Sequence, residues 1–338
     1  MFAEFHHKSN GGIQMIINTI DTHTAGEPTR ILGLQRVVGQ PPHENITQLR
    51  DWFSKNYDSV RQLLMQEPRG HDNMFGAVLA PSSHPKRDFG LFYFHPKGYL
   101  DSCGHATIGI VTALYDLGWF SEPRPIRFET PSGLIYGTPE LSNGTVDSVL
   151  LRGILPAFIK QTYEKFVVSG KEITAPISYV QAGNTFALID ATTIDIHIQH
   201  ENINYLREFA LILRNRANET VTLTDPFINN PTSVDIVVFY HRQNKVIQTV
   251  SVFGDGSVDR SPCGTGVCAL LELFHEQGEL AVGEELLFKS ITNTYFLGAL
   301  ASVESDDSQT TVHGSAHITG FHTFIRTSED PIDGFTLE

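Results

Sequence analysis

One pattern occurs twice along the chain, and this internal repeat constrains the fold more than any other feature of the sequence. Cys103 and Cys263 lie 160 residues apart (263 − 103), in the similar strings Asp-Ser-Cys-Gly-His-Ala-Thr-Ile-Gly and Asp-Arg-Ser-Pro-Cys-Gly-Thr-Gly. Each cysteine directly precedes a glycine-led run that is typical of a helix start. Each run ends 15 residues later, at Gly118 (118 − 103) and Gly278 (278 − 263), and glycine just past a helix is the usual stop signal. We therefore expect two equivalent helices, each with a cysteine at its beginning.

The repeat extends beyond these helices. A strand is predicted after each stop glycine, at residues 126–129 and 286–289, followed by a turn and by a second strand that closes at Gly137 or Gly298. Upstream, each cysteine follows an apolar strand and a loop that contains glycine. The same order of elements therefore occurs twice. It predicts a duplicated α/β unit with pseudo-two-fold symmetry, in which the two cysteine-bearing helix starts face one cleft.

Apolar patterning predicts the other main elements. Strands are expected at residues 15–20, 89–94, 234–240 and 246–253, and helices at residues 44–64, 107–117, 203–214 and 265–277. Asn45 is the expected N-cap of the first helix. The length of 338 residues favours two domains over a single core.

Composition and charge exclude several classes of function. The net charge is −14 and the sequence pI about 5.5, which argues against binding to nucleic acid or to an anionic membrane. No run of about 18 or more apolar residues predicts a membrane span, and no secretory leader is recognisable. Three cysteines do not form a disulfide framework, so we expect a cytoplasmic protein.

A thiol at a helix start has a distinctive chemistry. The first-turn amides of a helix lack intrahelical acceptors, and together with the helix dipole they attract anions. These amides belong to Gly104 and His105 in the first repeat and to Gly264 and Thr265 in the second. The same field favours the thiolate, so we expect a lowered cysteine pKa. Two such helix starts converging on one carboxylate would place a substrate α-carbon between two sulfurs.

This arrangement predicts an inversion of configuration that needs no cofactor. One thiolate removes the α-proton from one face, while the opposite thiol returns a proton to the other face, without pyridoxal phosphate. Asp259 is a candidate to bind the substrate ammonium, and the His105 side chain is a candidate to orient the substrate.

Ordinary structural roles compete with these assignments. Cys268 is expected to be a buried, inert cysteine. His105 taken alone would be a satisfied core histidine. Asp259 could equally form an ion pair with Arg260 or cap a helix.

A metal site is the second competing interpretation. The spacing of His313, His317 and His322 is similar to that of zinc ligands. No Cys-x-x-Cys or His-Glu-x-x-His motif accompanies them, and their segment is predicted as strand and turn. We therefore expect no metal.

Six segments in order resemble the signatures of the proline racemase family, whose fold is shared with diaminopimelate epimerase. They are Asp-Thr-His-Thr-Ala-Gly-Glu-Pro-Thr-Arg (21–30), Glu-Pro-Arg-Gly-His with Met-Phe-Gly (67–71 and 74–76), Gly-Tyr-Leu-Asp-Ser-Cys-Gly-His (98–105), Glu-Thr-Pro-Ser-Gly-Leu (129–134), Asp-Arg-Ser-Pro-Cys-Gly-Thr-Gly (259–266) and His-Ile-Thr-Gly-Phe (317–321). Any one segment is modest evidence, but six in order are strong.

The resemblance implies an α/β (α+β) fold of the diaminopimelate epimerase type. Two pseudo-symmetric domains are expected, each a curved, mostly antiparallel sheet around a central helix, with the active site in the interdomain cleft. The first would span residues 13–145 and carry Cys103, with residues from about 320 to 338 packing back on it. The second would span residues 146–319 and carry Cys263.

The resemblance also implies roles for individual residues. It implies Cys103 and Cys263 as the acid–base pair, the first-turn residues named above as the carboxylate binders and Asp259 as the amine binder. Racemases and 2-epimerases of the family generally keep both cysteines, whereas trans-3-hydroxyproline dehydratases replace one by Ser or Thr. The chain therefore resembles a racemase or 2-epimerase of proline or 4-hydroxyproline. A trans-3-hydroxy-L-proline dehydratase and a non-catalytic imino-acid-binding paralogue are the alternatives.

The substrate pocket is expected to include Tyr93, Thr185 and Phe253. The Thr185 hydroxyl would bind a 4-hydroxyl group on the substrate, or would only pack or bind water. The expected partner is a small molecule, proline or hydroxyproline, and the resemblance implies a homodimer. No cofactor, nucleic acid or membrane is expected.

Overall fold

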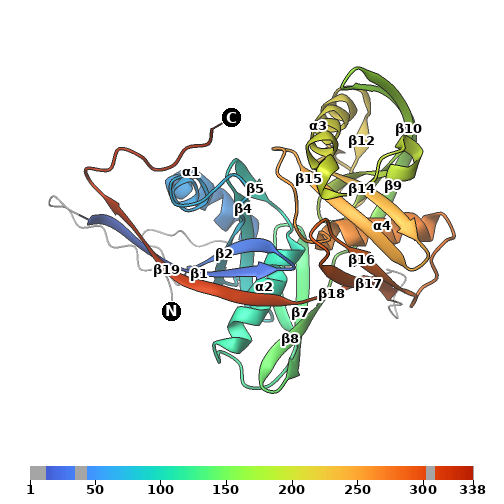
Figure 1. Ribbon diagram of the computed structural model, residues 1–338. Coiled ribbons are helices and arrows are strands. Elements are labelled where there is room, and N and C mark those ends of the chain that lie inside the picture. Colours follow the sequence, from blue (N-terminus) through green and yellow to red (C-terminus); the bar gives the residue numbers. More distant parts are fainter. Residues whose placement is uncertain (1–12, 35–43, 302–308, 338) are drawn as a thin grey trace. The chain divides into compact units, whose positions relative to one another are not determined.

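Two structural units make up the chain. The computed structural model describes residues 13–34, 44–301 and 309–337. Unit 1 comprises Met1–Leu151 and Ser315–Glu338, and unit 2 comprises Arg152–Gly314, so the C-terminal segment returns to the first unit. Each unit combines a mixed sheet with two helices longer than one turn among the described residues, and the fold is mixed α/β (Figure 1).

The elements of unit 1 follow in chain order. They are β1 (Ile13–Thr24), β2 (Glu27–Gly33), α1 (Ile46–Met65), β3 (Gly76–Pro81), β4 (Phe89–His95), β5 (Gly98–Leu100), α2 (Gly104–Asp116), β6 (Ile126–Thr130), β7 (Gly133–Ser142), β8 (Thr145–Arg152), which ends at the boundary, and β19 (Ala316–Thr327). Unit 2 contains β9 (Ala157–Val168), β10 (Lys171–Gln181), β11 (Thr185–Asp190), α3 (Ile203–Thr220), β12 (Leu223–Thr224), β13 (Pro231–Thr232), β14 (Ile236–Gln243), β15 (Val246–Phe253), α4 (Gly264–Glu276), β16 (Glu285–Lys289), β17 (Tyr295–Ala301) and β18 (Gln309–Gly314).

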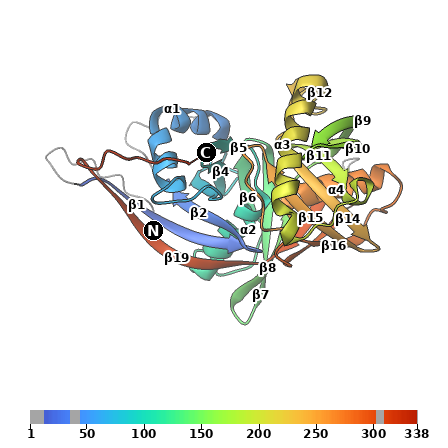
Figure 2. The same ribbon diagram turned by 45° about the horizontal axis from the view of Figure 1, so that its top comes forward.

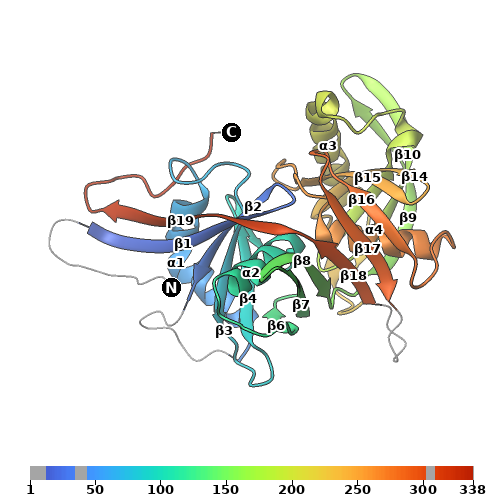
Figure 3. The ribbon, with the colours of Figure 1, turned by 60° about the horizontal axis from the view of Figure 1, so that its bottom comes forward.

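The two units share one pairing scheme. In unit 1, β1 is antiparallel to β2, β2 parallel to β3, β3 antiparallel to β4, β4 parallel to β6, and β6 antiparallel to β7. In unit 2 the same relations link β10, β11, β14, β15, β16 and β17. An outer strand is added to each, β19 beside β1 (Figure 3) and β9 beside β10. The repeated order of elements predicted from the sequence is therefore confirmed.

The helices lie on opposite faces of the unit 1 sheet (Figures 1 and 2). α1 packs on one face, in a core with Ile17, Leu32 and Phe92. α2 packs on the other face, where Thr22 and Thr24 of β1 contact its first two turns. In unit 2, α3 packs with β14 and α4 contacts β9, β10 and β17.

Both predicted glycine stops are confirmed. Gly118 and Gly278 have φ values of 75° and 72° and follow α2 and α4 by two residues. In α2 the Gly118 amide donates to the Tyr115 carbonyl and the Trp119 amide to the Leu114 carbonyl, both at 2.9 Å. The same two bonds close α4. Because a left-handed residue ends each helix, glycine is the favoured residue at both positions.

The strands predicted to close at Gly137 and Gly298 instead continue through them. β7 runs on to Ser142 and β17 to Ala301. Each glycine stands where a helix crosses the strand: an added Cβ would lie 2.5 Å from Val111 Cγ2 of α2, or 2.6 Å from Val267 Cγ1 of α4. The two glycines therefore allow a close helix–strand approach and do not mark strand ends.

Other predicted elements differ mainly in length. The predicted N-cap Asn45 is confirmed, since its Oδ1 accepts a hydrogen bond from the Gln48 amide at 2.9 Å. α2 begins three residues before the expected position, and α3 continues six residues beyond it. The long hairpin β9–β10 was not predicted, because β9 has only two buried residues, Phe166 and Val168, and so carries a weak apolar pattern. No helix in the described ranges is long and apolar enough to cross a membrane.

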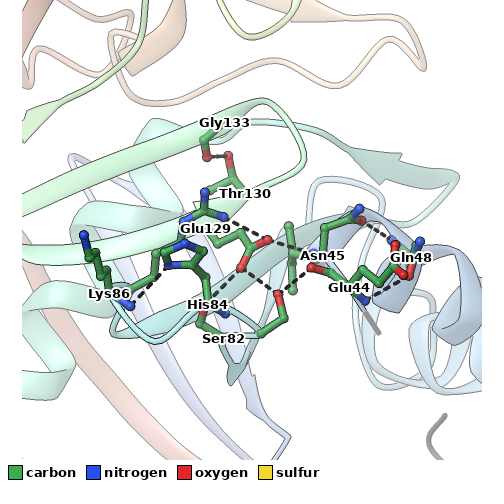
Figure 4. Close-up of polar contacts among 12 residues, drawn as sticks. Glu44, Asn45, Gln48, Ser82, His84, Lys86, Glu129, Thr130 and Gly133 are labelled. Atoms are coloured by element: carbon green, nitrogen blue, oxygen red, sulfur yellow. Dashed lines mark hydrogen bonds and ion pairs between the residues drawn. The ribbon is translucent and has the colours of Figure 1, made fainter. Parts of the chain in front are cut away.

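A buried carboxylate joins three separate segments of unit 1 (Figure 4). Glu129, at the end of β6, accepts hydrogen bonds from the Ile46 amide at the start of α1 and from the Ser82 hydroxyl after β3. The next residue, Thr130, donates to the Gly133 carbonyl at 2.8 Å and so closes the turn into β7. Charge-assisted bonds of this kind are stronger than neutral ones, so Glu129 holds the turn against α1.

The glycine contacts lead to a first prediction. Gly137→Ala and Gly298→Ala are each expected to lower the free energy of unfolding by about 1 to 3 kcal/mol, because the new methyl group overlaps a helix valine. Chemical denaturation measures this, with Gly98→Ala as control, since its Cβ would meet only His95 Nε2 at 3.6 Å. Val111→Ala is expected to recover most of the Gly137→Ala loss. Equal effects of all three glycine substitutions would contradict the packing argument.

Candidate active site

Cys103 is the N-cap residue of α2. Its φ and ψ of −153° and 105° are those of extended backbone, and the residue is 5% exposed. The first helical bond follows directly, from the Thr107 amide to the Cys103 carbonyl at 3.2 Å. The thiol therefore lies at the positive end of a helix dipole, as expected.

His105 stands beside this thiol as a neutral acceptor. Its Nδ1 and Nε2 lie 3.4 Å and 3.6 Å from Cys103 Sγ, and its ring meets Phe75 edge-on. Burial lowers the pKa of His105 to about 3, opposed by a hydrogen bond to the Pro28 backbone. Proline has no N–H, so the imidazole must donate to the Pro28 carbonyl. Its other nitrogen is therefore left as an acceptor.

Cys263 holds the equivalent position on α4 but with a different backbone. Its φ of 65° and ψ of 100° lie outside the regions that non-glycine residues favour. Such a conformation costs of order 1 to 3 kcal/mol and persists only where neighbours impose it. The Cys263 amide donates to Ser261 Oγ at 3.1 Å, and Val267 N–H donates to the Cys263 carbonyl at 2.8 Å.

The thiol of Cys263 folds back over the first turn of α4. A Cβ on Gly266 would lie 3.2 Å from both Cβ and Sγ of Cys263, and 3.5 Å from Ser251 Oγ. The Thr265 hydroxyl is 3.8 Å from the sulfur. Gly266 therefore leaves the space that the strained cysteine occupies.

Asp259 is a carboxylate almost without contact with solvent. It is 1% exposed, and its Oδ1 accepts a hydrogen bond from the Ser261 amide at 2.7 Å. Its Oδ2 is buried with no N–H or hydroxyl donor among the described residues. Burial raises the pKa of Asp259 to about 6, although bonds from Ser261 and the Cys263 thiol oppose this. An orphaned oxygen on a buried carboxylate can accept a hydrogen bond from a cationic ligand.

The expected lowering of the cysteine pKa is wrong for Cys263. Burial, and then the charge of Asp259, raise the pKa of this thiol well above its usual range. The Gly266 amide and the Thr265 and Ser251 hydroxyls act in the opposite direction but are outweighed. The helix start stabilises the thiolate, as the sequence argument assumed, but desolvation by the surrounding core is the larger effect.

The expected carboxylate binders lie where the sequence places them. Gly104 and His105 are the first two residues of α2, and Gly264 and Thr265 the first two of α4; all four are buried. Their amides precede the first i→i−4 bond and have no acceptor within their helices. Whether they bind a carboxylate stays a prediction.

The three expected pocket residues lie in different settings. Tyr93, in the middle of β4, is fully buried, and its hydroxyl is 2.7 Å from Thr107 Oγ1. Thr185 begins β11, and its hydroxyl contacts Gln181 Oε1 at 2.9 Å and Thr232 Oγ1 at 2.7 Å. Phe253 ends β15 and is 7% exposed. These assignments to the pocket stay predictions.

The candidate residues Thr185, Phe253 and Asp259 of unit 2 lie near the same end of neighbouring strands. Ile236 of β14 pairs with Phe186 on one side and with Phe253 on the other, so Thr185 and Phe253 lie at the same end. The Asp259 amide donates to the Ser251 carbonyl near that end of β15.

The remaining candidates are Cys268 and the possible metal ligands. Cys268 is buried, and its Sγ donates to the Gly264 carbonyl at 3.2 Å. Within the described residues, no group of three or more His, Cys, Asp or Glu side chains could hold a metal ion. Sequence reasoning missed Thr107, Ser261 and Gly266, whose only signal is their spacing of four, two and three residues from a cysteine.

The chain is similar to proteins of known activity along nearly its whole length. A family model described as proline racemase matches residues 19–336. A proline racemase of Clostridioides difficile is 35% identical over 336 residues, covering 95% of this chain and 98% of that protein. A trans-3-hydroxy-L-proline dehydratase of Bacillus thuringiensis subsp. konkukian is 28% identical, covering 96% of this chain and 99% of that protein. The crystal structure of a hydroxyproline epimerase from Agrobacterium vitis, with bound trans-4-hydroxy-L-proline, matches with a TM-score of 0.81 and 25% identity, covering 95% of this chain and 96% of that one.

A second prediction concerns Gly266. Gly→Ala within a helix normally stabilises by up to about 1 kcal/mol. Gly266→Ala is expected instead to destabilise unit 2 by about 1 to 3 kcal/mol, because its methyl group would lie 3.2 Å from Cβ and Sγ of Cys263, inside ordinary van der Waals contact, and the buried Cys263 has little room to move. Denaturant unfolding measures this, and the loss should shrink in a Cys263→Ala background, where the sulfur is gone. A stabilising Gly266→Ala would show that the thiol does not occupy this space.

A third prediction concerns the pH dependence of stability. The folded-state pKa of Asp259 is raised, so its ionised form costs stability, and this cost grows as pH rises from about 4 through the folded value. Asp259→Asn removes the cost. Its free energy of unfolding relative to wild type should therefore be higher at pH 8 than at pH 4, by about 1 to 3 kcal/mol.

Urea unfolding at the two pH values measures this difference. The exposed Asp72 supplies the control, because Asp72→Asn removes a carboxylate that is already in water. An Asp259→Asn effect of the same size at both pH values would refute the burial argument.

Proposed function

The chain belongs to the proline racemase family, and from this premise we propose that it inverts the α-carbon of proline or 4-hydroxyproline without a cofactor. Cys103 and Cys263 act as the acid–base pair. One thiolate removes the α-proton from one face, and the other thiol gives a proton to the opposite face of the same carbon. The first sulfur ends as a thiol and the second as a thiolate, so the charges balance. The protein is then ready for the reverse direction, and exchange of the sulfur protons with water restores the starting state.

The matched position of the two cysteines carries the proposal. Each is the N-cap of a buried helix, at the same point of the pairing scheme that the two units share. A two-base inversion requires one such group for each face of the α-carbon. We therefore also propose that two pseudo-symmetric domains face each other and that the substrate lies in the cleft between them. A homodimer remains a prediction of the resemblance, and a cytoplasmic location remains a prediction from the cysteine count.

The substrate carboxylate is assigned to the helix starts. The amides of Gly104, His105, Gly264 and Thr265 point out of their first turns, where the helix dipole favours an anion. Glycine at the first position lets the carboxylate approach the backbone closely. These contacts hold the α-carbon in place while the proton moves, and such positioning is a large part of catalysis.

The ring nitrogen is assigned to Asp259. Its orphaned Oδ2 supports this role, because a buried carboxylate oxygen that lacks a donor is stabilised when a cationic group donates to it. The charge of Asp259 also helps raise the pKa of Cys263. A bound ammonium would offset that charge and bring Cys263 closer to ionisation.

His105 is assigned to the Cys103 side of the reaction. Its imidazole is neutral and has one acceptor nitrogen, within 3.4 to 3.6 Å of Cys103 Sγ. It can receive the thiol hydrogen bond while Cys103 is protonated, and it is also the candidate to orient the substrate. The two cysteines therefore have different basic neighbours, an imidazole and a carboxylate.

Substrate selection is assigned to Thr185 and Phe253 in unit 2. The Thr185 hydroxyl already has Gln181 and Thr232 as partners, so a 4-hydroxyl group on the substrate would have to replace one of them. Proline and 4-hydroxyproline are therefore both included in the test.

Isotope exchange provides a fourth prediction. The full-length protein is incubated in D₂O with L-proline, trans-4-hydroxy-L-proline and trans-3-hydroxy-L-proline, and α-deuteration and optical rotation are followed. Incorporation of deuterium with inversion is expected for proline, 4-hydroxyproline or both. Loss of water from 3-hydroxyproline would instead identify a dehydratase, and absence of exchange with all three would overturn the proposal.

Three cysteine variants complete this test. Cys103→Ser and Cys263→Ser should each lower the inversion rate by about a thousandfold or more, because a serine hydroxyl is a far weaker acid at neutral pH. Cys268→Ser is the matched control and should stay within a few-fold of wild type. Near-full activity in either of the first two variants would exclude the two-thiol mechanism.

A further inference from the structure

A buried tyrosine lies behind the Cys103 half of the site. Tyr93 stands in the middle of β4, where it pairs in register with Ala77 of β3 and with Leu100 of β5. Its side chain has no exposed surface, and its hydroxyl oxygen lies 2.7 Å from Thr107 Oγ1. A buried phenol in an apolar core needs a partner of this kind, since an unpaired hydroxyl there is costly. That partner, Thr107, lies one turn into α2.

The directions of the hydrogen bonds can be assigned. Thr107 Oγ1 is also 2.8 Å from the Cys103 carbonyl oxygen, which can only accept. The single proton of the Thr107 hydroxyl is therefore donated to Cys103. Thr107 must then accept the proton of Tyr93, and a chain runs from the phenol through the threonine to the cysteine backbone.

The chain ends on the residue that carries the thiol. The Cys103 carbonyl accepts two bonds from the same residue, from Thr107 Oγ1 at 2.8 Å and from the Thr107 amide at 3.2 Å. Two bonds to one carbonyl fix the peptide plane of the N-cap residue. Hydrogen bonds in such a chain polarise one another, so the phenol strengthens the hold of the threonine.

Tyr93 is suited to remain a donor. Burial, and then the charge of Cys103, raise the pKa of its phenol far above the usual range. The phenol therefore stays protonated wherever the protein is folded.

Among the described residues, no such chain supports the Cys263 half of the site. Thr107 lies four positions after Cys103. The residue four positions after Cys263 is Val267, which has no hydroxyl group. Cys263 instead has a strained backbone, and its amide donates to Ser261 Oγ. The Thr249 hydroxyl donates to the carbonyl of Pro262, the residue before Cys263, at 3.4 Å. The two cysteines are thus fixed by different means.

We propose that Tyr93 and Thr107 are positioning residues that set the orientation of Cys103, and of Cys103 alone. Neither needs to touch the substrate for this role; Tyr93 acts through Thr107, and Thr107 acts through the Cys103 carbonyl. The catalytic meaning of the inference rests on the proposed function. The hydrogen bonds from Tyr93 to Thr107 and from Thr107 to Cys103 do not depend on that function, so the positioning role and the inversion mechanism can be refuted separately.

Cysteine alkylation tests the inference without any substrate. Full-length wild type, Tyr93→Phe and Thr107→Val are treated with iodoacetamide between pH 6 and 10, and the modification of Cys103 and Cys263 is followed separately by peptide mass spectrometry. Both variants should change the alkylation rate of Cys103 at least threefold and move its pH profile upward, because a loosened N-cap loses its fixed alignment with the helix amides. The Cys263 rate should stay within twofold.

Two further variants serve as controls. Thr107→Ser retains the hydroxyl and should restore the wild-type Cys103 profile. Tyr179→Phe removes the hydroxyl of another fully buried tyrosine, in unit 2, and should leave both cysteines unchanged. Equal changes at Cys103 and Cys263, or no change at Cys103, would overturn the inference.

Turnover provides a fifth prediction that separates the two proposals. If inversion is observed, Tyr93→Phe should lower kcat by about tenfold and leave KM within twofold, since displacing a reacting group costs rate more than binding. An unchanged kcat together with unchanged alkylation refutes the role of Tyr93 but leaves the inversion mechanism intact. A changed Cys103 profile in a protein that inverts no substrate upholds the Tyr93 chain and refutes the proposed function.

Discussion

The burial of α2 and α4 is the constraint on which the rest of the structure depends. Every residue of α2 from Gly104 to Tyr115 is buried, and α4 is buried along most of its length. A helix enclosed on all sides needs apolar residues around its whole circumference and small residues wherever a strand crosses it. Gly137 and Gly298 meet that need in the same way in the two units. The first-turn amides are then the polar groups that such a helix offers to a ligand, which is why the substrate carboxylate is proposed to bind beside the cysteines.

Equivalent positions in the two units do not have equivalent supports. Cys103 has a relaxed backbone, and its carbonyl accepts hydrogen bonds from Thr107. Cys263 has a positive φ, and its amide donates to Ser261 Oγ. A two-base reaction requires that both sulfurs be correctly placed, but it does not require that they be placed by the same means. Once a duplicated unit has placed both thiols, the residues behind them are free to diverge.

The parts that the sequence predicted are those set by local rules. The glycine stops, the Asn45 cap and the helix starts at the two cysteines follow from backbone preferences within a few residues, and all are confirmed. The mid-strand role of Gly137 could not be predicted, because it depends on which helix crosses the strand. The raised pKa of Cys263 was missed for a similar reason: a motif reveals the helix dipole but not how much protein surrounds the sulfur. The partner of the Tyr93 hydroxyl is equally non-local, since it lies on another element.

Asp259 links the stability of the free protein to the chemistry proposed for it. A carboxylate that is 1% exposed and has one orphaned oxygen is unfavourable in the folded state, and its charge makes the neighbouring thiol a weaker acid. Both penalties would be relieved by the same event, the arrival of a cationic ring nitrogen at Oδ2. Linkage requires that a ligand which favours the Cys263 thiolate is itself bound more tightly when that thiolate forms. In this scheme the free protein keeps Cys263 protonated and unreactive, and the acid–base pair becomes active only with substrate in place.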